Sequence, residues 1–128
     1  MSILNHTCVG TNNKAASEKF YTASLGELGI KCMGEMGNGA TMYGDKAPEF
    51  LVFTPRDGNT ASVGNGTTTG FRAATRAQVD AFHAAGMANG GTCDGPAGPR
   101  TNVAPTAYGA YLKDPDGNKV CAFCFADE

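Results

Sequence analysis

The two halves of the chain present the same landmarks in the same order, and this internal repeat restricts the fold more than any other feature. An apolar segment with helical spacing contains Phe20 in the first half and Phe82 in the second. In each half a glycine ends this segment, and a cysteine follows shortly after it. As many residues separate His6 from Phe20 as separate Thr68 from Phe82, so the repeat pairs His6 with Thr68. We therefore expect two copies of one structural unit.

The first half predicts one strand, one helix and three further strands. Ile3 to Gly10 has the pattern of a strand, and Asn12 or Asn13 suits the N-cap of a helix that ends near Leu28. Gly29 fits the stop of this helix, because glycine readily adopts the left-handed conformation that follows many helices. Three short strands are then expected at residues 30–35, 40–43 and 49–54, separated by glycine-rich turns.

The second half predicts a similar order. A strand is expected at residues 67–73, and Thr75 with Gln78 forms a capping box at the start of the next helix. Turn-forming residues dominate 94–100, so we expect turns there. Strands at 107–113 and 119–125 flank an Asp-Pro-Asp-Gly-Asn turn at 114–118, which indicates a hairpin.

Chain length and the position of the small residues predict one domain with two modules. The 128 residues suffice for a single core. Residues 62–66 are rich in glycine and small side chains, as expected of a short connection. We therefore expect a single domain over residues 1–128, with one module at about 1–62 and the other at about 67–128.

Charge and cysteine content restrict the partners. The formal net charge of -2 leaves no basic surplus, so we expect neither nucleic acid nor a membrane as a partner. The first residues lack the basic and apolar runs of a secretory signal, and five scattered cysteines do not form a disulfide framework. These features predict a cytoplasmic protein with reduced thiols.

Four sequence segments resemble the glyoxalase, bleomycin-resistance and extradiol-dioxygenase superfamily. The strongest likeness lies at Tyr108 to Val120 and at Val79 to Ala85, and Asn5 to Thr7 with Glu18 to Gly29 are similar to the family's first strand and helix. The resemblance implies an α+β fold of two tandem βαβββ modules, which form a curved mixed sheet around a cleft with the helices on the outer face. It also implies a homodimer, although the modules can pair within one chain or between two.

The same resemblance implies metal ligands on the first and last strands of the modules. His6 matches the family's first-strand histidine, while Thr68 stands where a second histidine is common. Cys121 takes the place of the last-strand glutamate, and Glu49 or Leu51 holds the equivalent position in the first module. No cofactor is therefore assigned with certainty. A divalent zinc, nickel or iron ion would have His6 and Cys121 as its protein ligands, whereas such sites usually have three or four.

Further candidate residues follow from strand alternation and side-chain chemistry. Tyr108 and Tyr111 face opposite sides of one strand, so only one of them can line the cleft. Cys121 and Cys124 also face opposite sides, which argues against chelation by the pair. Arg72 and Arg100 suit an anionic group on a substrate. The candidate ligand-binding residues are His6, Cys8, Thr68, Arg100, Tyr108 and Cys121.

No catalytic residue is assigned from the sequence, although a thiol and imidazole pair is open at His6 and Cys8, which share one strand face. His83 lies among apolar residues of a helix and is expected to cover core or edge surface.

Two functions remain at this point. The first is a protein that binds a small organic ligand in a sheet-lined cleft, with a degenerate metal site. The second is a metal-dependent lyase, isomerase or dioxygenase of the glyoxalase type. The missing ligand types favour the first.

Overall fold

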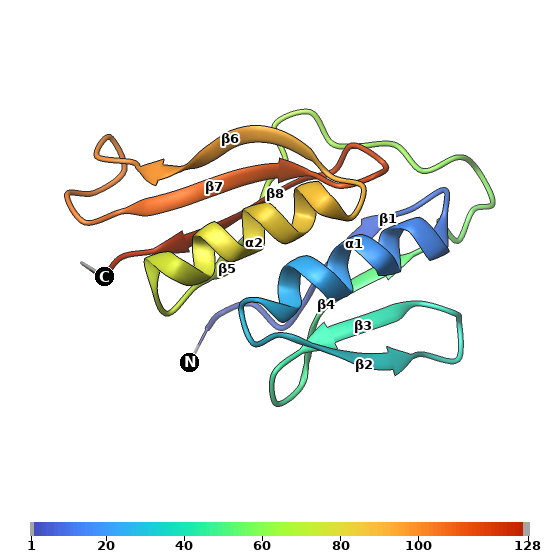
Figure 1. Cartoon of the computed structure of the whole chain (residues 1–128). Helices are drawn as coiled ribbons and strands as arrows, with labels where there is room; N and C mark the ends of the chain where they lie inside the picture. The colour runs from blue at the N-terminus through green and yellow to red at the C-terminus, as the bar shows by residue number, and fades with distance from the viewer. Residues whose placement is uncertain (1, 127–128) are drawn as a thin grey trace.

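The computed structural model describes residues 2–126 and contains two βαβββ modules (Figure 1). The first module consists of β1 (Thr7–Gly10), α1 (Lys14–Gly26), β2 (Lys31–Glu35), β3 (Thr41–Gly44) and β4 (Pro48–Phe53). The second consists of β5 (Thr69–Arg72), α2 (Arg76–Ala88), β6 (Thr92–Pro99), β7 (Tyr108–Lys113) and β8 (Lys119–Cys124). The predicted α+β class and the tandem βαβββ arrangement are thus confirmed.

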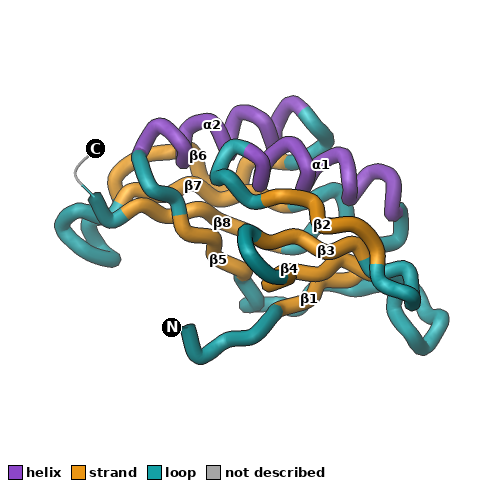
Figure 2. The backbone as a smooth tube through the Cα atoms, turned by 90° about the horizontal axis from the view of Figure 1, so that it is seen from below, coloured by secondary structure: helices purple, strands orange, loops and turns teal. Residues whose placement is uncertain are grey.

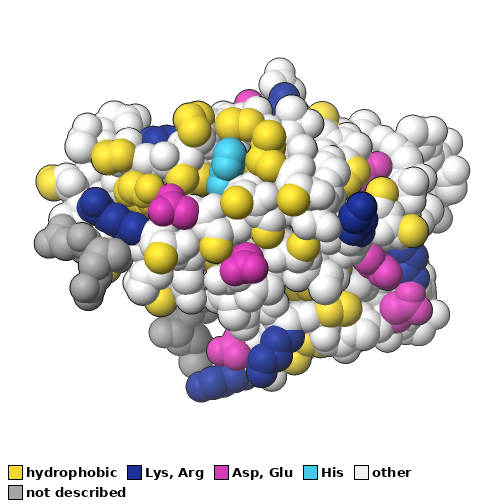
Figure 3. Space-filling view, in the orientation of Figure 1, with side chains coloured by type: hydrophobic (Ala, Val, Ile, Leu, Met, Phe, Trp, Pro, Cys, Tyr) yellow, Lys and Arg dark blue, Asp and Glu magenta, His cyan; other side chains and the backbone are white. Residues whose placement is uncertain are grey.

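Each module forms one four-stranded mixed sheet. The strand orders are β1-β4-β3-β2 and β5-β8-β7-β6, in which β1 runs parallel to β4 and β5 runs parallel to β8. Both helices lie side by side on one side of the strands (Figure 2). The helix-bearing face carries basic and acidic side chains interspersed (Figure 3). The first strand and the helix of the second module begin and end 62 residues after their counterparts in the first module.

Side-chain caps begin both helices. The Asn13 side chain accepts a hydrogen bond from the Ala16 backbone N–H at 3.0 Å, so Asn13 rather than Asn12 is the N-cap of α1. Thr75 accepts from the Gln78 N–H at 3.1 Å, and the Gln78 side chain accepts from the N–H of the residue before Thr75 at 2.8 Å. The predicted cap of α2 is therefore confirmed. Gly29 follows α1 with a φ of 81°, which a side chain would strain.

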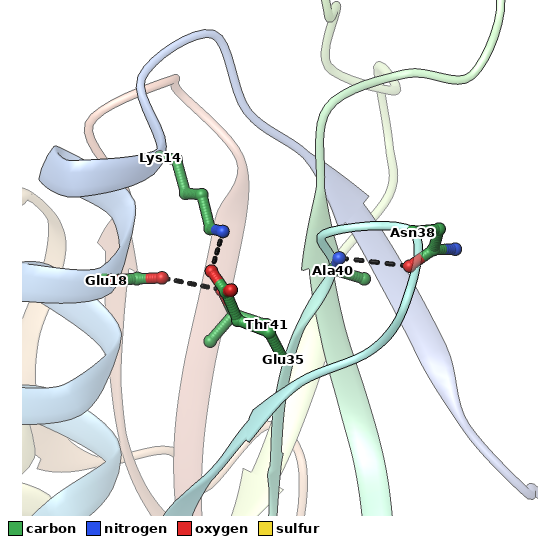
Figure 4. Close-up of polar contacts among 6 residues, drawn as sticks. All are labelled: Lys14, Glu18, Glu35, Asn38, Ala40 and Thr41. Atoms are coloured by element: carbon green, nitrogen blue, oxygen red, sulfur yellow. Dashed lines mark hydrogen bonds and ion pairs between the residues drawn. The ribbon is translucent and has the colours of Figure 1, made fainter.

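Polar contacts attach α1 to the first sheet (Figure 4). The Thr41 hydroxyl donates a hydrogen bond to Glu18 at 2.9 Å, and Lys14 pairs with Glu35 on β2. In the turn before β3, the Asn38 side chain accepts from the Ala40 N–H at 3.1 Å. The Glu18 and Lys14 contacts thus attach α1 to β3 and to the edge strand β2.

One hydrophobic core joins the two modules. It contains Phe20 and Tyr21 of α1, Phe50 of β4, Phe82 of α2 and Leu112 of β7, all of which are buried. Phe50 also meets Phe71 of β5 edge to face, with ring centroids 5.1 Å apart. Such aromatic contacts stabilise a core beyond simple area burial. The two sheets are therefore held by shared packing.

The turn at residues 114–118 connects the modules through a buried carboxylate. Asp114 is 3% exposed and accepts a hydrogen bond from the Tyr21 hydroxyl of α1 at 2.7 Å. Within its own turn it accepts from the backbone N–H groups of Asp116 and Asn118, at 2.9 and 2.8 Å. The Asn118 amide donates both to Asp114 and to the Gly10 carbonyl, each at 2.9 Å. A buried charge of this kind is tolerated because its acceptor positions are filled.

Asp116 in the same turn contacts the start of α1. Its carboxylate accepts from the Thr11 hydroxyl at 2.5 Å and from the Asn12 N–H at 2.7 Å. The sequence of this turn indicated only a local hairpin. In the structure, the turn also fixes the junction between β1 and α1 of the first module.

The expectation of turns at residues 94–100 was wrong, because residues up to Pro99 belong to strand β6. Thr92–Pro99 pairs with β7, with register shifts around Gly95 and Gly98. Bulges absorb glycine in such a strand, and proline is tolerated because β6 lies at the sheet edge. Composition indicated turns, but pairing with β7 overrides this local preference.

The alternation of β8 is confirmed. Val120, Ala122 and Cys124 belong to the core, whereas Cys121 and Phe123 belong to the opposite face. Cys121 and Cys124 therefore point away from each other, as expected.

Strand β1 is shorter than predicted and begins at Thr7 rather than Ile3. Within residues 2–126, no helix is long and apolar enough to cross a membrane.

Loss of the Tyr21 hydroxyl should destabilise the protein more than loss of a matched buried hydroxyl. Tyr21→Phe removes a hydrogen bond to a buried carboxylate, which is worth about 1.5–3 kcal/mol in the free energy of unfolding. Tyr43→Phe is the control, because Tyr43 is equally buried but its hydroxyl bonds to the neutral Thr22 hydroxyl at 3.3 Å, a contact worth about 0.5–1.5 kcal/mol. Urea unfolding measures both values. An equal loss in the two variants would contradict the role given to Asp114.

Candidate functional site

Two cavities meet along β5. The His6 cavity has a volume of about 750 Å³ and is lined by the N-terminal segment, the residues after α1, parts of β3 and β4, and residues 68–72. The aromatic cavity has a volume of about 440 Å³ and is lined by Gly70, Phe71, Arg72, Val103, Tyr111, Phe123 and Phe125. Gly70, Phe71 and Arg72 line both cavities, so β5 is their common wall.

The structure brings His6 and Thr68 to the same cavity. Each lies one residue before the first strand of its module, and both line the His6 cavity. The His6 Nδ1 atom lies 2.7 Å from the Asn5 side-chain oxygen, which orients the exposed imidazole ring. The carboxylates of Asp45 and Glu49 line the same cavity. This end of the cleft therefore offers polar groups beside apolar side chains such as Leu28 and Ile30.

Strand register decides the position that the sequence left open between Glu49 and Leu51. In the first module Cys8 pairs with Leu51, and in the second Gly70 pairs with Cys121. Cys8 and Gly70 are the second residues of β1 and β5, so Leu51 is the counterpart of Cys121. The last strand of the first module therefore offers a hydrocarbon side chain at this position.

The residues at the expected ligand positions do not fit a divalent metal ion. The four positions carry the imidazole of His6, the hydroxyl of Thr68, the hydrocarbon of Leu51 and the thiol of Cys121. Cys121 is 5% exposed, and this burial raises the pKa of its thiol to about 11, although nearby Lys119 opposes the shift. Metals bind the thiolate, so a thiol held in its protonated form is a poor ligand. Within residues 2–126, no three His, Cys, Asp or Glu side chains form a metal-binding group.

Stacked rings form the floor of the aromatic cavity. Tyr111 of β7 meets Phe123 of β8 edge to face with centroids 5.7 Å apart, and Phe123 stacks on Phe125 at 5.9 Å with an interplanar angle of 22°. Gly109 makes room for this floor, because a Cβ atom there would lie 2.7–2.9 Å from the Phe123 ring. The absence of a side chain at Gly109 therefore lets the Phe123 ring lie across the sheet.

Two further predicted ligand-binding residues, Tyr108 and Arg100, line neither cavity. The Tyr108 hydroxyl donates to Asp80 of α2 at 2.6 Å, which raises the pKa of Tyr108, and Arg76 lies over its ring. Tyr108 therefore faces the helix, and Tyr111 lines the cleft. Arg100 donates to the backbone carbonyls of residues 96, 98 and 99.

The two remaining cysteine predictions also lie outside the cavities. Cys8 is exposed but does not line either cavity, and partial burial raises the pKa of its thiol. Cys121 lies beside Gly70 of β5, and its sulfur is 3.3 Å from the point that a Cβ atom on Gly70 would occupy. A thiol and imidazole contact is found elsewhere: His83 Nε2 lies 3.2 Å from the Cys93 sulfur, and burial lowers the pKa of His83.

Phe123 and Phe125 are lining residues of the cleft that were not expected from the sequence. Arg72 had been considered for an anionic group, and Tyr111 had been left open beside Tyr108. The alternation of β8 contained the necessary signal, because residues two apart share a face of a strand. A cleft position for Cys121 therefore implies the same face for Phe123 and, beyond the end of the strand, for Phe125.

Comparison with known proteins agrees with this architecture. The family model described as Glyoxalase/Bleomycin resistance protein/Dioxygenase superfamily matches residues 3–122. The chain belongs to this superfamily. A glyoxalase/bleomycin resistance protein from Albidiferax ferrireducens T118 has 48% sequence identity and a TM-score of 0.85, over 96% of this chain and 98% of that one.

A more distant superfamily structure shares the fold. The lactoylglutathione lyase from Agrobacterium tumefaciens has 20% identity and a TM-score of 0.66, over 97% of this chain and 94% of that one. At this identity the likeness concerns the fold alone. The comparison with curated proteins gives no match.

Cys121 should be the slowly alkylated thiol when compared with exposed Cys32 on β2. Its pKa of about 11 lowers the thiolate fraction at pH 8 about 100-fold below that of an ordinary cysteine. A more basic thiolate is more nucleophilic and recovers part of this factor, so we expect alkylation at least about tenfold slower than at Cys32. Iodoacetamide labelling followed by peptide mass spectrometry measures both rates. Urea-unfolded protein is the control, in which the two rates should become similar.

Proposed function

We propose that this superfamily member binds a small organic ligand in the cleft along β5 without a divalent metal. The observation that carries the proposal is the common wall of the two cavities, which joins a polar end to an aromatic end. Cavities of about 300–1,000 Å³ with apolar walls and a few polar groups are typical of small-molecule sites.

The two ends of the cleft would perform different parts of recognition. A flat ring would pack on Phe123 and Tyr111, since offset and edge-to-face aromatic contacts are favourable. His6 and Thr68 would form hydrogen bonds with polar groups of the ligand at the other end. Of the residues predicted from the sequence, these two keep a direct role in the proposal.

The proposal includes assembly and location. We infer a homodimer, which the superfamily resemblance supports. Sedimentation analysis would measure the molecular mass in solution. The scattered cysteines support a cytoplasmic location with reduced thiols.

The alternative is a metal-dependent lyase, isomerase or dioxygenase. The observation in its favour is His6, an imidazole at the superfamily's first-strand ligand position, with Glu49 lining the same cavity. In that case the metal would act as a Lewis acid on a substrate oxygen. Leu51, Thr68 and buried Cys121 count against it, because they provide no adequate third ligand.

Metal content distinguishes the two functions. Protein purified without added metal should contain far less than one equivalent of zinc, nickel or iron, and His6→Ala should not change this value. Elemental analysis of both proteins, normalised to protein concentration, makes the measurement. One equivalent of metal that disappears in the variant would refute metal-free binding and support the enzyme.

Ligand binding tests the aromatic end of the cleft. With 2-naphthalenemethanol as a neutral probe, Phe123→Ala should weaken binding about tenfold, in line with the roughly 0.5–1.5 kcal/mol of an aromatic pair plus lost apolar contact. Phe53→Ala is the matched control, because Phe53 pairs with Gly10 as Phe123 pairs with Arg72 but lies outside both linings. Titration calorimetry measures the affinities. An equal effect of both substitutions would place the ligand elsewhere.

A further inference from the structure

We propose that the cleft selects a flat aromatic anion, whose carboxylate binds Arg72 while its ring packs on Phe123. This inference rests on the proposed function and specifies the class of ligand. Three features support it: the position of Arg72, the lack of a partner for its guanidinium among the described residues, and the distribution of charge around the aromatic rings.

Arg72 lies where the two cavities meet. It is the last residue of β5, it is exposed, and it lines both cavities. Among the described residues that line the aromatic cavity, it is the charged one. A ligand whose ring occupies the aromatic cavity therefore has a guanidinium at the boundary with the polar end.

The Arg72 guanidinium is available to a ligand, in contrast to the guanidinium groups of Arg76 and Arg100. Arg76 donates to the carbonyls of Thr106 and Ala126, and Arg100 donates to three backbone carbonyls. Between residues 2 and 126, the Arg72 side chain has no hydrogen bond, ion pair or ring contact. A planar guanidinium matches a carboxylate through two parallel hydrogen bonds, which makes it a specific as well as an attractive partner.

Two further cationic groups lie against the Tyr111 ring. The Lys119 ammonium lies 4.9 Å from the Tyr111 ring centroid, and the Arg100 guanidinium lies 5.7 Å from it. Lys119 also pairs with Asp94 at 3.1 Å, so its charge is partly balanced. The cationic groups around the rings favour an anionic ligand and disfavour a cationic one.

Acidic groups determine where the negative group of the ligand would lie. Asp45 and Glu49 line the His6 cavity, on the opposite side of the common wall from the aromatic rings. They would repel a carboxylate that reached deep into the polar end. The carboxylate is therefore placed beside Arg72, and the neutral polar groups of a longer ligand would extend toward His6 and Thr68.

Three naphthalene probes that differ in charge test the inference with the full chain. They are 2-naphthoate, neutral 2-naphthalenemethanol and the 2-naphthylmethylammonium ion, with each affinity measured by titration calorimetry at neutral pH. We expect the anion to bind about tenfold more tightly than the neutral probe, as for a partly exposed charge-assisted contact, and the cation to bind most weakly. The advantage of the anion should decrease as salt concentration rises.

Arg72→Gln should abolish the preference for the anion, measured as the ratio of the affinities for the anionic and neutral probes, because the guanidinium that would bind the carboxylate is removed. Arg56→Gln is the matched control, since Arg56 is also exposed but lies outside both linings. Circular dichroism and urea unfolding confirm that both variants are folded. A retained preference in Arg72→Gln, or its loss in Arg56→Gln, would overturn the role of Arg72.

The outcomes separate this inference from the proposed function. Equal affinities of wild-type protein for the neutral and anionic probes would overturn the inference and leave ligand binding supported. Failure of all three probes to bind would contradict both. The neutral probe could also bind only at low protein concentrations, where the chain is monomeric. This result would show that a second copy covers the aromatic cavity, and it would overturn the inference as well.

Discussion

The buried carboxylate of Asp114 is the contact on which the relation of the two modules depends. It collects hydrogen bonds from its own turn and one from Tyr21 in the other module. A charge with almost no exposure is costly unless its acceptor positions are filled, so the turn and the helix are strongly favoured in this one arrangement. Because the modules share one core, this arrangement also determines how β5 lies against the N-terminal segment and thus where the cleft is formed.

The two modules repeat the same backbone arrangement, but they place different side chains at equivalent positions around the cleft. Strand register makes Phe53 the counterpart of Phe123 and Gly10 the counterpart of Arg72. His6 and Thr68 are a third unlike pair. Among the described residues that line the cleft, Arg72 and Phe123 come from the second module and the imidazole of His6 comes from the first. Such differences allow one superfamily fold to support several functions, because function depends on the groups in the site.

Much of the fold was predictable because its signals are local. The helix caps at Asn13 and Thr75, the turn at 114–118 and the alternation of Cys121 and Cys124 all depend on residues within a few positions of one another. The expectation of turns at 94–100 failed because β6 forms by pairing with a strand that follows it, despite its glycine and proline content. The aromatic cavity was missed for a related reason, since its walls come from β5, β7, β8 and the segment that precedes β7.

By itself, the sequence determined the two-module repeat, the starts of the helices and the pairing of His6 with Thr68, because periodicity, capping and repeat spacing act over short stretches of chain. The tertiary structure alone decided that Leu51 is the counterpart of Cys121, that Tyr111 rather than Tyr108 lines the cleft, and that Asp114 joins the modules. These outcomes depend on register, burial and contacts between residues far apart in the chain, and such properties exist only once the two modules have packed together.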